Sequence, residues 1–506
     1  MESLPPSEKS KRIINYRPLF EIAVGLMLGI AAAGSLPQNG GIVLCATFLL
    51  CAAVHAVLRR RMRLLIFALC VLLGNVLSIV NLPYNIEEGT HTVIGFVEKI
   101  DISDESKEIV LTNVEIDCKK FNKRVLISVK EEFEVSVGDE VELCLRINEV
   151  ERDSPQYNYY LSRGIGAVSE ADYASVLSHD HLPLSRFKSK AASTVRKIAA
   201  KLFGETDGTL IASVLVGSFD IPERRQKIYQ ATGTAHLLAI SGIHMTIAAS
   251  IVGMLIPNRF RFAKPVAVIM AILFYLAISE PTVGVQRAAI MSSIAVIFRS
   301  MRRCPDSLSA LSLAAIVILA INPYAMFSVS FLLSFSAAFG IVVFSPFMTA
   351  ELEERGLNLA SIGIVTTISA SVAVAVIQMH FFGTFPVYLI LANCFVVPAF
   401  TLLLQMSVFC ILLCLVLPGV AMMLASIPSG LLLLTENFMG LVSRLPYAEI
   451  GVVPLPTVCC VIALLMIYFV SDNVLLPKRK KLLPTFVGFV AFASVYGIAI
   501  LKEFGR

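Results

Sequence analysis

Long apolar runs, separated by short polar stretches, cover most of the chain. Most of them are close to the length at which an α-helix crosses a bilayer. The runs lie at about residues 19–36, 41–58, 64–80, 265–278, 283–298, 308–321, 326–347, 361–382, 386–417, 420–442, 455–470 and 484–501, and the stretch Gly233–Ser250 begins another. The pattern predicts a polytopic α-helical membrane protein with about twelve spans.

The run at 386–417 is too long for one simple span. Pro398 lies inside it, and a proline removes one backbone hydrogen bond of a helix and clashes with the preceding turn. We therefore expect a kink or a break in this helix.

A polar region at 88–172 has a different periodicity. Apolar and polar residues alternate at 91–100, 108–116, 124–129 and 140–147, and Gly138-Asp139 is a turn signal. Alternation with period two is typical of half-buried strands. The region predicts a small β domain, of a size that suits a compact barrel of the oligonucleotide/oligosaccharide-binding (OB) type.

These changes of pattern divide the chain into four parts. We expect three N-terminal transmembrane helices at 1–87, the β domain at 88–172, amphipathic or re-entrant linker helices at 173–232, and a transmembrane domain at 233–506. Within the linker, at Pro183–Gly204, apolar residues recur at helical spacing among six cations and no acid; the cations are Arg186, Lys188, Lys190, Arg196, Lys197 and Lys201. This pattern predicts a basic helix on a membrane surface, contacting lipid headgroups or other phosphates.

Composition and charge indicate where the chain is located and how it is oriented in the membrane. Hydrophobic residues make up 56% of the chain and charged residues 16%, which excludes an ordinary soluble domain. Arg59, Arg60, Arg61 and Arg63 separate the second and third runs. Because basic loops stay in the cytoplasm, we place this loop and the N-terminus there and the β domain outside.

The β domain is acidic. Residues 88–172 contain ten Lys or Arg against 19 Asp or Glu, which argues against a generally basic nucleic-acid surface. One basic cluster is formed by Lys119, Lys120, Lys123 and Arg124 around Phe121. It is either a solvated strand-turn face or a place where DNA phosphates bind and a base stacks. Outside the cytoplasm, Cys118 and Cys144 could pair as a disulfide.

The stretch Gly233–Ser250 carries polar groups where a bilayer makes them costly. His236, Ser241 and His244 could share one face of a helix. Such groups usually face a bundle interior or a wet cavity, and the nearby small residue Gly242 allows close helix packing. We expect pore lining or interhelical packing, with a Ser-His nucleophile as the alternative. The sequence contains no GxxxxGK[ST], HExxH or GxSxG motif, and we expect no cofactor and no metal.

Four segments carry a family resemblance. His236–Met245, HLLAISGIHM, resembles the signature of the ComEC family of competence proteins, the inner-membrane channels for DNA uptake. Tyr157–Ile165 resembles the segment that closes the external domain of that family. Pro281–Met291, with Arg287, is similar to its proline-arginine span, and Asn322–Ile341 resembles its phenylalanine- and serine-rich helix. The order of the parts along the chain matches as well.

The resemblance implies a non-enzymatic channel in the plasma membrane that imports single-stranded DNA during natural transformation. His236, Ser241, Gly242, His244 and Arg287 would line or shape the pore. The DNA-backbone candidates become Lys119, Lys120, Lys123, Arg124, Arg186, Lys188, Arg196 and Lys197. The implied partners are a DNA receptor outside and a helicase or single-strand-binding protein in the cytoplasm.

The sequence departs from the family pattern in two ways. Many relatives end in a metallo-β-lactamase-like domain, and this sequence stops shortly after its last apolar run. We expect a form without that domain, which leaves room for a separate nuclease. Ser328, Ser330 and Leu332 stand where the family's helix has an acid, a glycine and a glutamine.

Two other functions fit the same residues. The first is a transporter or flippase of another anionic polymer or lipid, which a polar-centred bundle and a basic surface helix would also serve. The second is an intramembrane hydrolase built around Ser241 and His244.

Overall fold

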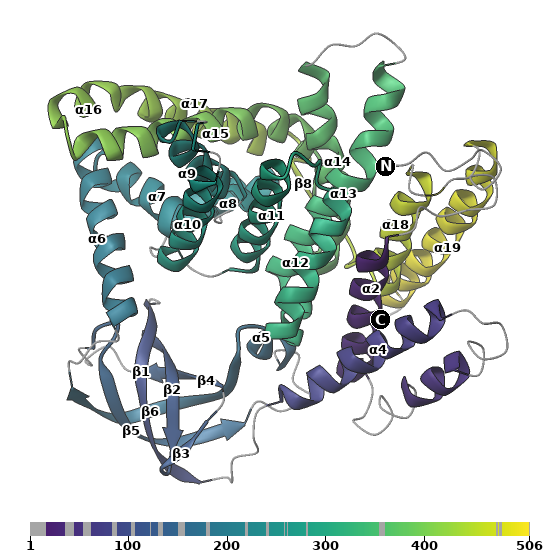
Figure 1. Ribbon diagram of the computed structural model, residues 1–506, viewed down its shortest axis with the longest axis horizontal. Coiled ribbons are helices and arrows are strands. Elements are labelled where there is room, and N and C mark those ends of the chain that lie inside the picture. The colour runs from purple at the N-terminus through teal and green to yellow at the C-terminus, as the bar shows by residue number, and fades with distance from the viewer. Residues whose placement is uncertain are drawn as a thin grey trace. The chain divides into compact units, whose positions relative to one another are not determined.

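The structure is a computed structural model that describes residues 17–35, 45–53, 62–82, 89–102, 107–121, 123–129, 135–149, 157–178, 183–217, 221–238, 242–257, 259–260, 262–279, 282–353, 360–471, 474 and 478–504. Contacts divide the chain into two units. The first, called the β-containing unit, comprises 19–194 and 312–331. The second, called the helical unit, comprises 1–18, 195–311 and 332–506. Figure 1 shows that helices dominate the chain.

A six-stranded sheet occupies the polar region of the sequence. Its strands are β1 (Thr90–Ile102), β2 (Lys107–Ile116), β3 (Lys119–Lys120), β4 (Arg124–Val129), β5 (Glu140–Glu149) and β6 (Ile165–Ser178). The four predicted strand segments are confirmed as β1, β2, β4 and β5. β1 pairs antiparallel with both β2 and β5. β2 also pairs with β4, β5 pairs with β6, and β4 pairs with β6 in parallel.

The alternation along the strands places apolar side chains on both faces of the sheet. On one face, Val125 and Ile127 of β4 join a buried cluster with Val93 of β1 and Leu143 of β5. On the other face, Leu126 packs with Val110, Ile165 and Tyr160 of the short helix α5 (Tyr157–Ser162). The two-sided burial explains why β4, with the sequence RVLISV, has so few polar positions.

Two helices of the β-containing unit approach each other at glycines. α2 (Pro18–Ser35) and α4 (Arg63–Val80) lie so close that a Cβ added at Gly29 would come within 1.9 Å of the Val71 carbonyl oxygen. A Cβ at Gly74 would come within 2.2 Å of the Leu26 carbonyl oxygen. Small residues permit this backbone contact, which supplies the packing that holds helices together in an apolar surrounding.

Two of the segments that carry the family resemblance meet in this unit. The Nδ2 amide of Asn322 donates to the carbonyl oxygens of Leu161 and Ser162 in α5, at 3.3 and 2.9 Å. Its Oδ1 accepts from the backbone N–H of Tyr324 at 3.1 Å and caps the 3₁₀ helix η2 (Pro323–Phe327). The Tyr324 hydroxyl donates to the Ser78 carbonyl oxygen of α4 at 3.0 Å. The turn at Asn322–Tyr324 therefore joins α5, which lies between β5 and β6, to the apolar helix α4.

The boundary between the β-containing unit and the helical unit lies within α6 (Pro183–Phe203), between Thr194 and Val195. The elements that follow α6 are α7 (Glu205–Val216), α8 (Glu223–Ala231), the 3₁₀ helix η1 (Ala235–Leu237), α9 (Gly242–Leu255), α10 (Ala263–Ile278), α11 (Val283–Ser300), α12 (Ser307–Ile321), α13 (Val329–Glu353), α14 (Ala360–Phe382), β7 (Thr384–Pro386), α15 (Leu389–Cys414), α16 (Pro418–Leu424), α17 (Ser426–Ser443), β8 (Glu449–Gly451), α18 (Thr457–Val470) and α19 (Lys478–Phe504). α12 and α13 each extend across the boundary between the units.

The helices of this unit pack in three groups. α9, α10 and α11 share a core of Met245, Ile272 and Val285. α15 packs against α17, and α16 connects the two (Figure 1). α14, α18 and α19 pack around Ile377 and Cys459.

Several helices have the properties of membrane spans. Among the described residues, five stretches are long and apolar enough to cross a bilayer: α4, 329–349 of α13, 363–382 of α14, α15, and 418–443, which contains α16 and α17. Shorter apolar helices include α9, α10, α12 and α18. The structure is therefore compatible with a polytopic membrane protein, and the count of about twelve spans stays a prediction.

Of the two alternatives for the run at 386–417, the break is wrong, because α15 runs as one helix of 26 residues with Pro398 inside it. A kink at Pro398 stays a prediction. Proline removes one backbone hydrogen bond from the helix. A break would leave the backbone groups of a whole turn without partners in a bilayer that contains no water, which costs more free energy.

We predict that Asn322→Asp destabilises the chain by about 1–3 kcal/mol. The substitution keeps an oxygen that can cap η2 but removes the amide that donates to Leu161 and Ser162, and it leaves their carbonyl groups without that donor. The measurement is the thermal midpoint of the purified full chain in detergent. An unchanged midpoint would show that these two hydrogen bonds do not hold α5 in place.

Candidate functional site

The central stretch begins at a sharp turn after α8. Gly233 has φ of +72°, and a Cβ there would come within 2.3 Å of Leu389 Cδ1. Only glycine combines this left-handed conformation with so close an approach. On either side, the hydroxyls of Thr232 and Thr234 are 2.9 Å apart, and Thr234 also donates to the Met439 sulfur of α17 at 3.2 Å. The turn is thereby fixed against α15 and α17.

The prediction that His236, Ser241 and His244 lie on one helix is wrong. His236 is an exposed residue of η1, whereas α9 begins only at Gly242. Ser241 lies outside the described residues. The apolar composition predicted one continuous helix, but the turn at Gly233 starts a short 3₁₀ segment that ends before α9. His236 and His244 therefore belong to different elements.

His244 is buried between helices. Its ring stacks on Tyr275 of α10, with ring centroids 6.4 Å apart and an interplanar angle of 15°. The Tyr275 hydroxyl donates to the Leu215 carbonyl oxygen of α7 at 2.5 Å. A chain of contacts thus links α9, α10 and α7, as expected of a polar group that packs helices.

Gly242 and Arg287 lie in the same group of helices. A Cβ at Gly242 would be 3.7 Å from the Cβ of Ala288, in ordinary contact, so α9 begins beside α11. Arg287 of α11 is half-buried, and its Nε atom is buried without a hydrogen-bond partner among the described residues. A guanidinium in this position is costly unless it faces a polar ligand or water. The structure thus places three of the five predicted pore residues, Gly242, His244 and Arg287, in the α9–α11 group.

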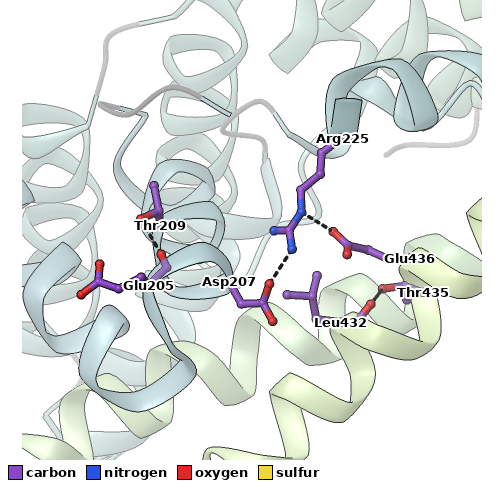
Figure 2. A network of polar contacts seen from close by, with 7 residues as sticks. All are labelled: Glu205, Asp207, Thr209, Arg225, Leu432, Thr435 and Glu436. Atoms are coloured by element: carbon purple, nitrogen blue, oxygen red, sulfur yellow. Dashed lines mark hydrogen bonds and ion pairs between the residues drawn. The ribbon is translucent and has the colours of Figure 1, made fainter. Parts of the chain in front are cut away.

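An ion-pair network adjoins the turn that opens the central stretch (Figure 2). Arg225 of α8 donates from Nη2 to Asp207 Oδ1 of α7 at 2.5 Å, and its Nε lies 3.4 Å from Glu436 Oε1 of α17. The three side chains are 22, 34 and 24% exposed, respectively. Burial alone would lower the pKa of Arg225, but its hydrogen bond to Asp207 and the two nearby carboxylates raise it. The guanidinium stays charged and ties three helices together.

Sequence reasoning missed this network. Its one visible signal was Glu436, an acid inside the apolar run at 420–442. An ionisable residue in such a run indicates a functional site by default. Its partners Asp207 and Arg225 stand more than 200 positions earlier, and no local pattern connects them.

The basic cluster of the β domain divides into two kinds of residue. Lys119 and Lys120 are exposed on β3. Lys123 is half-buried, and burial lowers its pKa. Arg124 is held within the domain, because Nη2 pairs with Glu98 at 2.6 Å and Nη1 donates to the Arg163 carbonyl oxygen at 3.2 Å. Lys119 and Lys120 are therefore the cations best placed to meet a ligand.

An acid lies beside these lysines. Asp117 accepts from the Thr92 backbone N–H at 3.1 Å and contacts His91 Nδ1 at 2.5 Å. The hydrogen bond with His91, the one with Thr92 and the charges of His91 and Lys119 lower the pKa of Asp117. The carboxylate is thus kept ionised next to Lys119 and reduces the positive charge of the cluster.

The predicted amphipathic helix is confirmed as α6. Ala192, Ala199 and Phe203 are buried, whereas Arg196 and Lys197 are exposed and Lys188 is half-buried. The side chain of Arg186 lies outside the described residues. A Cβ at Gly208 of α7 would come within 2.6 Å of the Ala199 backbone, so α7 lies against the apolar face of α6. Arg196 and Lys197 remain exposed beside this contact.

Cys118 and Cys144 do not form the predicted disulfide in this structure. Both thiols are free and exposed. Cys118 follows β2 and Cys144 lies in β5, and β1 pairs between these strands. Two strand spacings amount to about 10 Å, which is more than a disulfide spans. In the described part of the chain, no group of three or more His, Cys, Asp or Glu side chains could hold a metal ion.

Comparison with known proteins gives one family and two relatives. The family model described as "Competence protein" matches residues 215–474. "ComE operon protein 3" of Bacillus subtilis is 29% identical over 208 residues, which are 40% of this chain and 25% of the relative. "Recombination protein 2" of Haemophilus influenzae is 31% identical over 192 residues, 35% of this chain and 23% of the relative. The matched part thus spans about a quarter of each relative, and no solved structure matches.

We predict that Arg225→Gln lowers the stability of the full chain by about 1.5–3 kcal/mol. Its charged hydrogen bond to Asp207 would be lost, and both carboxylates would lose their counter-charge. The matched control is Arg224→Gln on the same helix, because Arg224 is exposed and such changes usually stay within about 0.5 kcal/mol. The measurement is thermal unfolding in detergent at neutral pH, and equal midpoints for the two variants would contradict the role given to Arg225.

Proposed function

The chain belongs to the competence protein family, and we propose that it forms a channel that passes single-stranded DNA across the plasma membrane into the cytoplasm during natural transformation. The observation that carries the proposal is the family match over 215–474. This segment contains His244, Arg287 and Glu436, which are polar groups set among apolar helices. A polyanion cannot enter hydrocarbon, and ionisable residues within membrane helices are the usual markers of a polar path.

The orientation is part of the proposal. The N-terminus lies in the cytoplasm and the β domain outside, which the run Arg59, Arg60, Arg61 and Arg63 supports through the positive-inside rule. Under this orientation the linker helix α6 follows directly from the external domain. DNA would meet the β domain and α6 before the helices at 233–506.

The β domain is proposed to be of the OB type and to receive the incoming strand. Support comes from the strand pairings, which lead from β1 through β2, β4, β6 and β5 back to β1. Five principal strands are the number that an OB-fold uses. Lys119 and Lys120 are exposed for contact with phosphates. With Arg124 paired to Glu98, this contact is weak, and the domain guides the strand without gripping it.

α6 offers a second basic surface. Arg196 and Lys197 are exposed and Lys188 is half-buried, and cations on a stable helix can follow a phosphate backbone without reading its sequence. The same face would bind lipid headgroups, which keeps a transporter or flippase of another anionic polymer or lipid as the rival function.

Other proteins complete the proposed pathway. The sequence has no phosphate-cradling loop, so the energy for transport comes from a gradient or a partner. We propose a DNA receptor outside and a helicase or single-strand-binding protein in the cytoplasm.

The test of the function is uptake of labelled DNA by cells with and without this gene. Surface-bound and nuclease-protected label are scored separately. Loss of the protected fraction alone is the expected result, because the surface receptor would still bind DNA. Unchanged protected label in a transformable host would reject the channel and favour the rival.

We predict that changing Lys188, Arg196 and Lys197 together to Gln weakens binding of single-stranded DNA by the full chain. Each lost phosphate contact lowers the slope of log affinity against log salt by about 0.7. The matched control changes the exposed residues Arg299, Arg302 and Arg303 to Gln. It removes the same charge from the loop after the run at 283–298, which lies in the cytoplasm under the proposed orientation if each run crosses the membrane once. Equal slopes for the two triple variants would remove α6 from the DNA path.

We also predict that Ser241→Ala retains normal uptake of DNA, since the proposed channel is not an enzyme. Gly242→Leu should reduce uptake at least tenfold, because the larger side chain would meet Ala288 of α11, whose Cβ is 3.7 Å from the position of a Cβ at Gly242. Uptake is compared at equal amounts of membrane-inserted protein. Loss of uptake in Ser241→Ala, with normal insertion, would support the intramembrane hydrolase instead.

A further inference from the structure

The network around Arg225 has an excess of negative charge. Two carboxylates, Asp207 and Glu436, face one guanidinium. The helices packed against Glu436 supply no further counter-charge, because α15 and α16 contain no Asp, Glu, Lys, Arg or His and Glu436 is the only such residue of α17. The remaining charges of α8 are exposed, and Glu223 pairs with Lys227 at 2.9 Å. The network therefore carries one uncompensated negative charge when both carboxylates are ionised.

The guanidinium of Arg225 lies closer to Asp207 than to Glu436. Its Nη2 makes a short hydrogen bond of 2.5 Å to Asp207, whereas the distance from Nε to Glu436 is 3.4 Å. Figure 2 shows Arg225 extending from α8 toward both carboxylates. Asp207 is also the more exposed of the two acids. The uncompensated charge consequently falls on Glu436, which lies on an apolar helix.

A second observation marks the same place. Tyr229, one turn after Arg225 on α8, is only 1% exposed, and its hydroxyl has no hydrogen-bond partner among the described residues. Burial raises its pKa, and so does the charge of Glu436, which lies within electrostatic range. A buried hydroxyl that lacks an acceptor among the described residues is thus electrostatically coupled to a carboxylate that lacks a full counter-charge. Such unsatisfied groups are costly and indicate a missing ligand.

We propose that Glu436 is a proton-binding site whose protonation state sets how tightly α17 is held to α8. With the proton bound, Glu436 is a neutral acid and Arg225 pairs with Asp207. When the proton leaves to water, the Glu436 carboxylate competes for Arg225 and can accept from Tyr229. No other bond forms or breaks.

The position of this site gives it a consequence for the central stretch. Met439, three residues after Glu436 on α17, accepts from Thr234 in the turn that opens this stretch. The Arg225–Glu436 ion pair therefore attaches α8 to α17, and the Thr234–Met439 hydrogen bond attaches the turn after α8 to the same side of α17. Release of the proton strengthens the first attachment and draws the turn toward α17. This inference goes beyond the proposed function, since it concerns proton binding and not the transported polymer.

The test is infrared difference spectroscopy of the full chain in lipid, recorded while the pH is raised. The expected result is loss of a carboxylic-acid band as the pH rises, and absence of this band from Glu436→Gln. That variant keeps the shape of the neutral acid and should fold. The matched control is Glu205→Gln, an exposed acid of α7, which should retain the band. A band of unchanged intensity in Glu436→Gln would overturn the proposal.

Two further variants give shifts of opposite sign. Asp207→Asn leaves Arg225 to Glu436 alone, which favours the charged form, and should move the midpoint of the band to lower pH. Arg225→Gln removes the positive charge and should move it to higher pH. Equal midpoints in both variants, or a midpoint that moves when sodium replaces a bulky organic cation, would overturn proton binding at Glu436. None of these readouts requires DNA, so a failure here is distinguishable from a failure of the channel.

Discussion

A polar group that lies among apolar helices has to find its partner within the protein, because hydrocarbon offers none. This constraint explains the main connections of the helical unit. Arg225 is held by Asp207 and Glu436, the Tyr275 hydroxyl by a carbonyl group of α7, and Thr234 by the Met439 sulfur. The contacts of Arg225 with Glu436, of Tyr275 with Leu215 and of Thr234 with Met439 join elements that are far apart in the sequence. The need of polar groups for hydrogen-bond and ion-pair partners therefore also determines which helices pack together. The central stretch begins beside two of these contacts, the Arg225 network and the Thr234–Met439 hydrogen bond.

The sequence predicted the elements whose cause is local. The segment 124–129 was predicted as a strand and is β4, and the basic helix expected after Pro183 is α6, because alternation and helical spacing are visible within a few residues. The turn at Gly233 was missed for the opposite reason. Its left-handed conformation accompanies a close approach to Leu389, more than 150 positions later. The residues around Gly233 are apolar and small, and such residues are as compatible with a continuous helix as with a turn.

The candidate site shows the same division. Residues adjacent in sequence were expected to act together, but Arg124 is bound by Glu98, which is 26 positions earlier, while Lys119 and Lys120 remain exposed. His236 and His244 were assigned to one helix and lie on two elements. Glu436 could be recognised from its apolar neighbours, yet its partners could not. A sequence thus identifies residues that need a partner, and only the fold shows which partner they find.

The contact of Asn322 with α5 has a consequence for the order in which the protein is made. It joins residues about 160 positions apart, so the ribosome must synthesise α6 to α12 before this anchor can form. All the strands of the sheet, including β6 with its parallel pairing to β4, have been synthesised once residue 178 has emerged. The sheet can therefore assemble early, but it stays without its anchor through most of helix insertion. Long-range contacts of this kind form slowly, which makes the docking of Asn322 a late step in biogenesis.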